Sequence, residues 1–419
     1  GHQLISQVEV EIGGQRIDRQ YGDWMQLWYQ LTSSSEQARG YAKMVGNTTQ
    51  LTYITDPTFA DVNGPCGGDA PVNVCAPRNA LPETTLYIPL QFWYCRNPGL
   101  ALPLIALQYH EVKINLDLRP IDECLWAMND LSSDSGNQQS ATAYHQSLVA
   151  ASLYVDYIFL DTDERRRMAQ NPHEYLIEQL QFTGDESVGS SSNKIKLNFN
   201  HPCKEIIWVV QPDANVDYCA SYTGGELLYK VLGAQPFNYT DAVDALPNAV
   251  HAFGGEKATA GQEGVIEFVK DASGAFQDDK ADDILDANAG VVDSGVSDAG
   301  TFVLAETALT MHCWGLNPVV VAKLQLNGQD RFSEREGTYF DQVQPWQHHT
   351  RSPDTGINVY SFALRPEEHQ PSGSCNFSRI DNATLQLVLS NATVAGTATA
   401  KVRVYATNYN VLRVMSGMG

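Results

Sequence analysis

The chain has 419 residues, of which 43% are hydrophobic and 18% are charged, and its formal net charge at pH 7 is −22. This length suits two domains, each with its own core, and the composition is globular. No run of about 18 apolar residues is present to span a bilayer, and the acidic balance opposes close binding to nucleic-acid phosphates, which needs clustered Lys and Arg.

The first predicted element is a strand-and-turn unit that occurs twice in the chain. Residues 8–18 alternate apolar and polar side chains around the pair Gly13-Gly14, and residues 322–332 repeat this pattern around Asn327-Gly328. Such pairs accept the positive φ of tight hairpin turns. Further stretches correspond in the same order, namely 86–93 with 358–365 and 153–159 with 402–409. We therefore predict two all-β modules on one plan, with longer loops in the first.

A short helix is predicted directly after the first unit. Trp24, Leu27, Trp28 and Leu31 have the i, i+3, i+4, i+7 spacing of one helical face. We expect this helix to cap a barrel end, and we place its aromatic stripe in a core rather than in a ligand groove. Residues 32–82 are rich in Ser, Thr, Asn, Gly and Pro, which favours a long loop.

Apolar runs mark the remaining strands of both modules. The first module has such runs at 86–95 and 100–118, with clean alternation over 112–118, and residues 148–160 are expected to close it as a strand. Residues 164–173 are charged and lack an apolar period, which predicts a linker. Strands then resume at 174–182, 194–199 and 206–210. An acidic insertion rich in Ala and Gly covers 212–315.

Eight cysteines are sparse for this length, and no CxxC pair occurs, so neither a disulfide framework nor a zinc ribbon is indicated. Cys66 and Cys75 flank one loop and could form a bridge, although free thiols are favoured. Two N-x-[ST] sequons lie in or beside predicted loops, at Asn47 and Asn238, and these are the candidate glycosylation sites.

The usual dinucleotide, phosphate and hydrolase signatures are absent from the sequence. The pair His348-His349 could bind a divalent ion beside Asp341 or Glu336, but a solvent-exposed pair is the favoured interpretation. Residues 281–290 have some likeness to a calcium loop, yet they lack the acidic spacing of an EF-hand. We predict no catalytic, cofactor or metal site.

Several long stretches resemble the major capsid proteins of large icosahedral DNA viruses of eukaryotes, most closely the algal, chlorella-virus-like branch. The stretches are EVEIGGQRID (9–18), PGLALPLIALQYHEV (98–112), VDYIFLD (155–161), PHEYLIEQLQFTG (172–184), LNGQDRF (326–332), QPSGSCNFSRIDNAT (370–384) and NYNVLRVMSGMG (408–419).

The resemblance implies an all-β fold of two tandem eight-stranded jelly-roll barrels, at 1–163 and 174–419, joined by the linker 164–173. It also implies that three copies form a pseudo-hexagonal capsomer and that capsomers tile an icosahedral shell over an internal membrane. The implied partners are other copies of the chain, minor capsid proteins, a penton protein and, indirectly, that membrane, without direct contact to nucleic acid. Assembly is expected in the host cytoplasm.

The chain departs from this plan in one respect, and the fold leaves one alternative function open. Strands at 174–210 precede the second turn unit, whereas few residues precede the first, so the first barrel is expected to lack its first strands. Jelly rolls also serve as carbohydrate-binding lectins, and Tyr53, Tyr218 and Tyr222 could stack on sugars. A monomer that binds glycans would favour that alternative, and a trimer the capsid.

Overall fold

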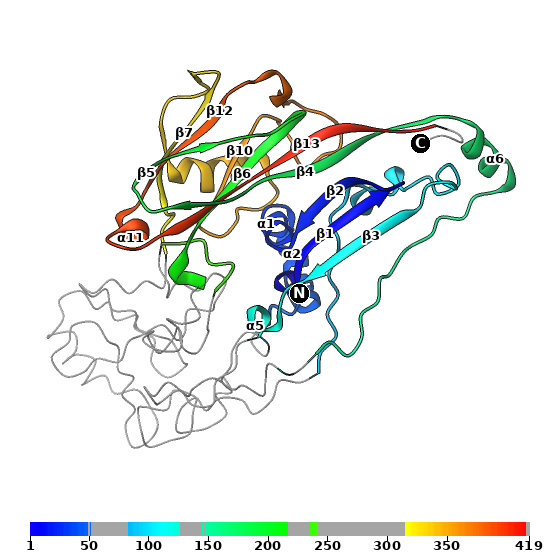
Figure 1. Ribbon diagram of the computed structural model, residues 1–419, viewed down its shortest axis with the longest axis horizontal. Helices are drawn as coiled ribbons and strands as arrows, with labels where there is room; N and C mark the ends of the chain where they lie inside the picture. The colour runs from blue at the N-terminus through cyan, green and yellow to red at the C-terminus, as the bar shows by residue number, and fades with distance from the viewer. Residues whose placement is uncertain are drawn as a thin grey trace.

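The computed structural model describes residues 1–48, 51, 83–125, 145, 147–216, 235–241 and 315–415, and antiparallel strands dominate this part of the chain (Figure 1). The strands are β1 (Ile5–Ile12), β2 (Gln15–Tyr21), β3 (Val112–Leu118), β4 (His173–Val188), β5 (Ser192–Lys196), β6 (Pro202–Pro212), β7 (Val319–Leu326), β8 (Gln329–Asp330), β9 (Arg335–Glu336), β10 (Ile357–Ser361), β11 (Cys375–Asn376), β12 (Ala383–Leu389) and β13 (Ala400–Val414). The helices are α1 (Gly22–Thr32), α2 (Ser35–Val45), α4 (Trp93–Arg96), α5 (Ile121–Cys124), α6 (Thr162–Gln170), α10 (Gln344–His348) and α11 (Asn391–Val394), with a π-helical segment, η5 (Tyr339–Val343), before α10.

The repeated strand-and-turn unit is confirmed as two hairpins. β1 pairs with β2 through Gly13 and Gly14, whose φ angles are 60° and 82°. β7 pairs with β8 through Asn327 and Gly328, whose φ angles are 51° and 80°. Two positive φ angles in succession give a turn whose twist matches that of the flanking strands, which is why these residue pairs recur.

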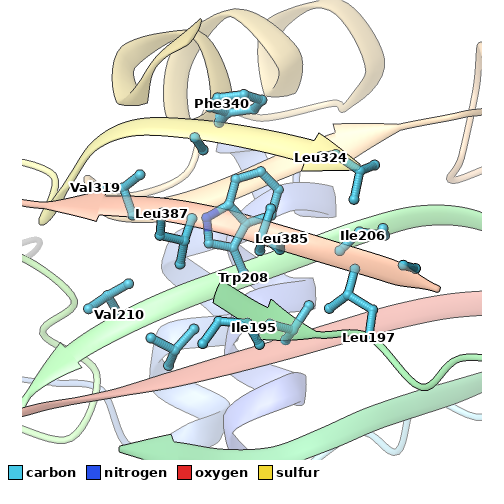
Figure 2. Packing of buried hydrophobic residues seen from close by; sticks show 14 of the residues in the cluster. Ile195, Leu197, Ile206, Trp208, Val210, Val319, Leu324, Phe340, Leu385 and Leu387 are labelled. Carbon is cyan, nitrogen blue, oxygen red and sulfur yellow. The ribbon is translucent and has the colours of Figure 1, made fainter. Parts of the chain in front are cut away.

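The second half of the chain forms a sandwich of two five-stranded sheets. One sheet has the order β10-β6-β13-β4, with β11 beside β6, and the other has the order β5-β12-β7-β8, with β9 beside β7. β6 is buried on both faces, so its successive side chains enter two different cores. Ile206, Trp208 and Val210 point into the sandwich among Leu385 and Leu387 of β12 (Figure 2). The continuous apolar run at 206–210 reflects this burial on both faces.

The opposite face of the same sheet carries α1. The predicted helix is confirmed, and its stripe of Trp24, Leu27, Trp28 and Leu31 packs against Ile207 and Val209 of β6, Ile357 and Val359 of β10, and Tyr405 of β13. The stripe is a core, as expected. This core joins the first half of the chain to the sandwich formed by the second half, which we call the second sandwich. It does not close an end of the first barrel.

Strands β4 and β13 extend beyond the sandwich as a long paired ribbon towards α6 (Figure 1). Ile177 of β4 enters the core formed by Ile5, Val8 and Val10 of β1 together with Phe92 and Trp93. Tyr175 and Leu412 pack against this core, and Val414 joins Ile12 in a small neighbouring cluster. The three-stranded sheet β2-β1-β3 is therefore covered by strands of the second sandwich.

Two segments expected to be strands have no strand structure, and of the predicted run 100–118 only 112–118 is a strand, β3. Residues 86–92 are irregular, and Phe92 and Trp93 instead turn into the core around β1, where Trp93 begins α4. Residues 148–160 run alone before α6 with most apolar side chains exposed, so the closing strand is a wrong prediction for the described residues. A strand needs a partner for its N–H and C=O groups, and among the described residues none pairs with this segment.

Two further segments are helical where none was predicted. Residues 35–45, expected to lie in a loop, form α2, in which Tyr41 stacks on Tyr29 of α1 with ring centroids 4.2 Å apart. The charged stretch expected to act as the linker 164–173 contains most of α6, whose start is fixed by a capping box between Asp161 and Glu164. Within the described part of the chain, no helix has the length and apolar character needed to cross a membrane.

Candidate functional site at the junction of the modules

The junction between the β1–β3 sheet and the second sandwich contains a buried carboxylate, Asp18 of β2. Its Oδ1 accepts hydrogen bonds from the backbone N–H groups of Leu180, at 3.0 Å, and Arg19, at 2.9 Å. Leu180 lies on β4, the last strand of its sheet, so the carboxylate satisfies an N–H group on a sheet edge. Burial raises the pKa of Asp18 to about 7, against these hydrogen bonds and the nearby Arg96, which act to lower it.

A second polar contact across the junction centres on Glu178 of β4. One carboxylate oxygen receives Nη2 of Arg96 at 2.9 Å, and the other receives Nζ of Lys204 at 2.9 Å. Lys204 is completely buried and also donates to the carbonyl oxygen of Pro366 at 2.6 Å. Arg96 belongs to α4 and lies 4.8 Å from the ring centroid of Trp28. Breaking a buried pair of this kind leaves an uncompensated charge, so these contacts fix how the two parts sit.

A third contact joins the modules through Asp23 at the start of α1. Its carboxylate forms ion pairs with Arg119 and with Arg403 of β13, with N···O distances of 3.2 Å and 3.4 Å. Arg403 also pairs with Asp185 of β4 at 2.9 Å. Together with the α1 stripe, the three contacts make a junction that is apolar at its centre and tied by charges around it.

The pair His348-His349 was expected to be solvent-exposed, and for His349 this expectation is wrong. Its side chain is completely buried between Glu205, at 2.9 Å from Nε2, and Glu367, at 3.0 Å from Nδ1. Burial acts to lower the pKa of His349, but the two carboxylates outweigh it and raise that pKa to about 9. Asp341 and Glu336 are not its partners. No group of three or more His, Cys, Asp or Glu side chains in the described ranges is arranged to hold a metal ion.

The two candidate glycosylation sites differ in their surroundings. Asn47 is exposed just after α2. Asn238 is buried, its Nδ2 donates to Gln235 at 2.9 Å, and its Oδ1 accepts from the backbone N–H of Thr240 at 3.1 Å. Of these two side chains, Asn47 is therefore exposed and Asn238 is not. Cys66, Cys75, the stretch 281–290 and the three tyrosines considered as sugar platforms lie outside the described residues.

Several large apolar side chains are exposed at two places. One is the segment 147–161, where Tyr154 is 83% exposed and Phe159 is 93% exposed. The other is a patch formed by Trp346, 74% exposed, and Leu364, 72% exposed, which we call the Trp346 patch. The carbonyl oxygen of Leu364 lies 3.0 Å from Nδ1 of His348, two residues from Trp346, so the two side chains sit on adjoining segments.

Sequence reasoning missed the charged residues of the junction because it assigned charge to the surface. The available signal was Lys204-Glu205, two charged residues directly before the apolar run at 206–210. Charged side chains that continue a strand buried on both faces have to be paired inside the fold.

Comparison with known proteins gives matches over almost the whole chain. Residues 1–161 match the family described as "Major capsid protein N-terminus", and residues 164–419 match "Large eukaryotic DNA virus major capsid protein". The chain is 77% identical to the major capsid protein of Phaeocystis pouchetii virus, with 100% of this chain and 80% of that protein covered.

Solved structures agree with the sequence matches. A quasi-atomic model of the PBCV-1 virus capsid matches with a TM-score of 0.56 at 32% identity, covering 100% of this chain and 83% of that one. The Faustovirus major capsid protein matches in fold with a TM-score of 0.60 at 14% identity, covering 99% of this chain and 72% of that one.

Proposed function

Because the chain belongs to the major capsid protein family of large eukaryotic DNA viruses, we propose that it works as a homotrimer whose pseudo-hexagonal capsomers tile the virion shell. Its place in the shell as a structural subunit follows from the family, and the resemblance found in the sequence is confirmed. The fold class of two jelly-roll modules is confirmed with it.

The observation that carries the trimer is the junction between the two modules, which is packed and cross-linked by buried charges. Each copy presents two modules on the same hairpin plan, held at one angle by the α1 core and the charged contacts of Asp18, Glu178 and Asp23. Three copies around a threefold axis would place six similar modules at six corners. A flexible junction would not hold such corners in register, so the buried charges serve the assembly.

The mass of the chain in solution tests the trimer. Light scattering at micromolar concentration should give about 138 kDa for the chain of 46.1 kDa, three times the mass of one copy. A stable monomer under these conditions would contradict the proposal.

We place the Trp346 patch at a contact between copies, because Trp is enriched among the residues that dominate protein interfaces. Replacing Trp346 and Leu364 together by Ser should shift the trimer towards monomer without unfolding the chain. The matched control is Val320→Ser on β7, a singly exposed apolar side chain, which should leave the mass unchanged. Equal masses for all three proteins would remove the patch from the interface.

Further features of the function remain proposals. We propose that the modules divide at 1–163 and 174–419, that minor capsid proteins, a penton protein and, indirectly, an internal membrane are partners, and that nucleic acid is not contacted directly. Asn47 is proposed as the accessible glycosylation site, and the subunit is proposed to act without catalysis. The absence of enzymatic motifs in the sequence and the structural role of the family support this last proposal.

A further inference from the structure

Two cysteines lie directly opposite each other in the second sandwich. Cys203 of β6 and Cys375 of β11 are register partners in an antiparallel pair, and the next pair is Pro202 with Asn376. Directly opposed residues of antiparallel strands have Cα atoms about 4.5–5.5 Å apart and side chains on the same face. Disulfides join Cα atoms about 4.4–6.8 Å apart, so the backbone already holds the spacing that a bond needs.

Both cysteines are free thiols in the structure, and they differ in access. Cys203 is completely buried in the sandwich core, where its Sγ lies 3.6 Å from the carbonyl oxygen of Asn200. Cys375 is half-buried and packs against the edge of that core. A dissolved oxidant therefore reaches Cys375 first, and Cys203 reacts only through it.

The strand position of this pair gives it a structural consequence. Three successive residues of β6 contact the loop 362–374 or its end. Cys203 faces Cys375, which follows the loop, and Lys204 donates to the carbonyl oxygen of Pro366. Glu205 pairs with His349, whose other ring nitrogen pairs with Glu367 of the loop. β11 itself has only two residues, so its ladder is short. A covalent bond at this point would fix the loop that supplies groups to the buried charges of the junction.

We propose that Cys203 and Cys375 are a redox site that forms a cross-strand disulfide when the protein meets a disulfide oxidant of the glutathione class. The Cys375 thiolate attacks one sulfur of the oxidant and expels a thiolate. The Cys203 thiolate then attacks Sγ of Cys375 and expels the second. The two cysteines lose two electrons and two protons, and the oxidant is reduced to two thiols.

The surroundings of the two sulfurs set the rate and the persistence of this bond. Burial raises the pKa of both the Cys203 and the Cys375 thiols, so little thiolate is present at neutral pH and oxidation should accelerate as the pH rises. Once formed, the bond has its Cys203 sulfur inside the core. Reduction by a thiol should begin, like oxidation, at the half-buried Cys375 sulfur and expel the Cys203 thiolate into the core.

Peptide mapping of the full chain tests the proposal. After incubation with oxidised glutathione at about pH 8 and digestion without reduction, mass spectrometry should find a cross-linked peptide pair containing Cys203 and Cys375. Hydrogen exchange at residues 375–377 should slow by roughly tenfold or more in the oxidised protein. A double variant, Cys95→Ser with Cys124→Ser, removes two exposed thiols and should keep the cross-link.

Single variants separate a site from incidental oxidation. Cys203→Ser should leave Cys375 as a stable glutathione adduct, and Cys375→Ser should leave Cys203 unmodified. The proposal is overturned if Cys375 of the unsubstituted chain accumulates the same adduct as Cys203→Ser, or if Cys203 pairs with a different cysteine. Failure of this test would leave the trimer untouched, because the trimer is measured by mass.

Discussion

The core of the second sandwich contains only residues between 188 and 406, whereas the core around β1 also takes in Ile177 from β4 and packs against Tyr175 and Leu412. The second sandwich therefore buries its two inner faces against each other, and only the outer face of one sheet takes its cover from the first half of the chain, through α1. The β1–β3 sheet depends on a ribbon that comes from its neighbour. Damage to the second core should spread to the first, and damage to the first should stay local.

The largest expected effect comes from Trp208→Ala in the second core. Trp208 is 1% exposed and lies 5.1 Å, centroid to centroid, from Phe340, so its removal leaves a large cavity. We expect a loss of about 3–5 kcal/mol in the free energy of unfolding. Hydrogen exchange should rise in both halves, because β4 and β13 cover β1. The control Val320→Ala, which truncates a singly exposed apolar side chain on β7, should change stability by less than about 0.5 kcal/mol.

Met25→Ala tests whether damage to the core around β1 stays local. Met25 is fully buried beside Val8 and Val10, and its truncation should cost about 2–5 kcal/mol locally. Exchange should rise over β1 to β3 while residues 319–406 keep their protection. Equal loosening of both halves would show that the two cores form one cooperative unit.

Glu178→Gln tests the charged contacts of the junction between the modules. The substitution removes the negative charge that Arg96 and Lys204 share, and Lys204 is left buried with the carbonyl oxygen of Pro366. We expect a loss of about 3 kcal/mol in the free energy of unfolding, measured by denaturant titration at one protein concentration. The control is Glu174→Gln on the same strand, whose pair with Arg413 is exposed and should contribute less than about 1 kcal/mol. Equal losses would mean that the junction charges are solvated.

His349 makes the second sandwich sensitive to alkaline pH. Its pKa is raised in the fold to about 9 from its ordinary value of 6.5, so its stabilising charge is fully present below about 6.5 and is lost as the pH rises through about 9. Between pH 7 and 9.5 the free energy of unfolding should fall by roughly 2 kcal/mol more in the unsubstituted chain than in His349→Gln. The neighbouring His348→Gln should keep the full pH dependence.

Local patterns were sufficient where the structure is decided locally. The Gly13-Gly14 and Asn327-Gly328 pairs located both hairpins, and the spacing of Trp24 and Trp28 located α1. These features depend on turn conformation and helical period, which a few neighbouring residues determine.

Patterns failed where a distant partner decides the structure. Residues 148–160 have the composition of a strand, but a strand exists only when another strand meets its edge, and local sequence does not show that. The same limit hid the buried charges. Lys204 and His349 look like surface residues until Glu178 on β4, or Glu205 and Glu367, are brought beside them by the fold.

Asp18 gives an effect no larger than that of His349 but the most direct test of the junction, because its carboxylate lies between the two cores. Its pKa is raised in the fold to about 7 from its ordinary value of 3.8, so the folded chain holds this proton more tightly than the unfolded chain. Stability is therefore lost as the pH rises from about 4 to about 7 and then becomes constant. Between pH 5.5 and 8 this amounts to roughly 2 kcal/mol, in a lower pH window than that of His349.

Asp18→Asn should remove this dependence, because the amide keeps an oxygen for the N–H groups of Leu180 and Arg19 but carries no charge. Hydrogen exchange of the Leu180 amide, measured against pH, reports on the contact itself. In the unsubstituted chain its protection should weaken above about pH 7, when the buried carboxylate ionises and water is drawn to the junction, whereas in Asp18→Asn it should stay constant. Leu180 lies on β4, the edge strand of the sheet β10-β6-β13-β4. A loss of protection there without a change at Trp208 would therefore place the pH response between the modules. An unchanged pH profile in the variant would show that Asp18 is ionised at all these pH values and that the junction tolerates its charge.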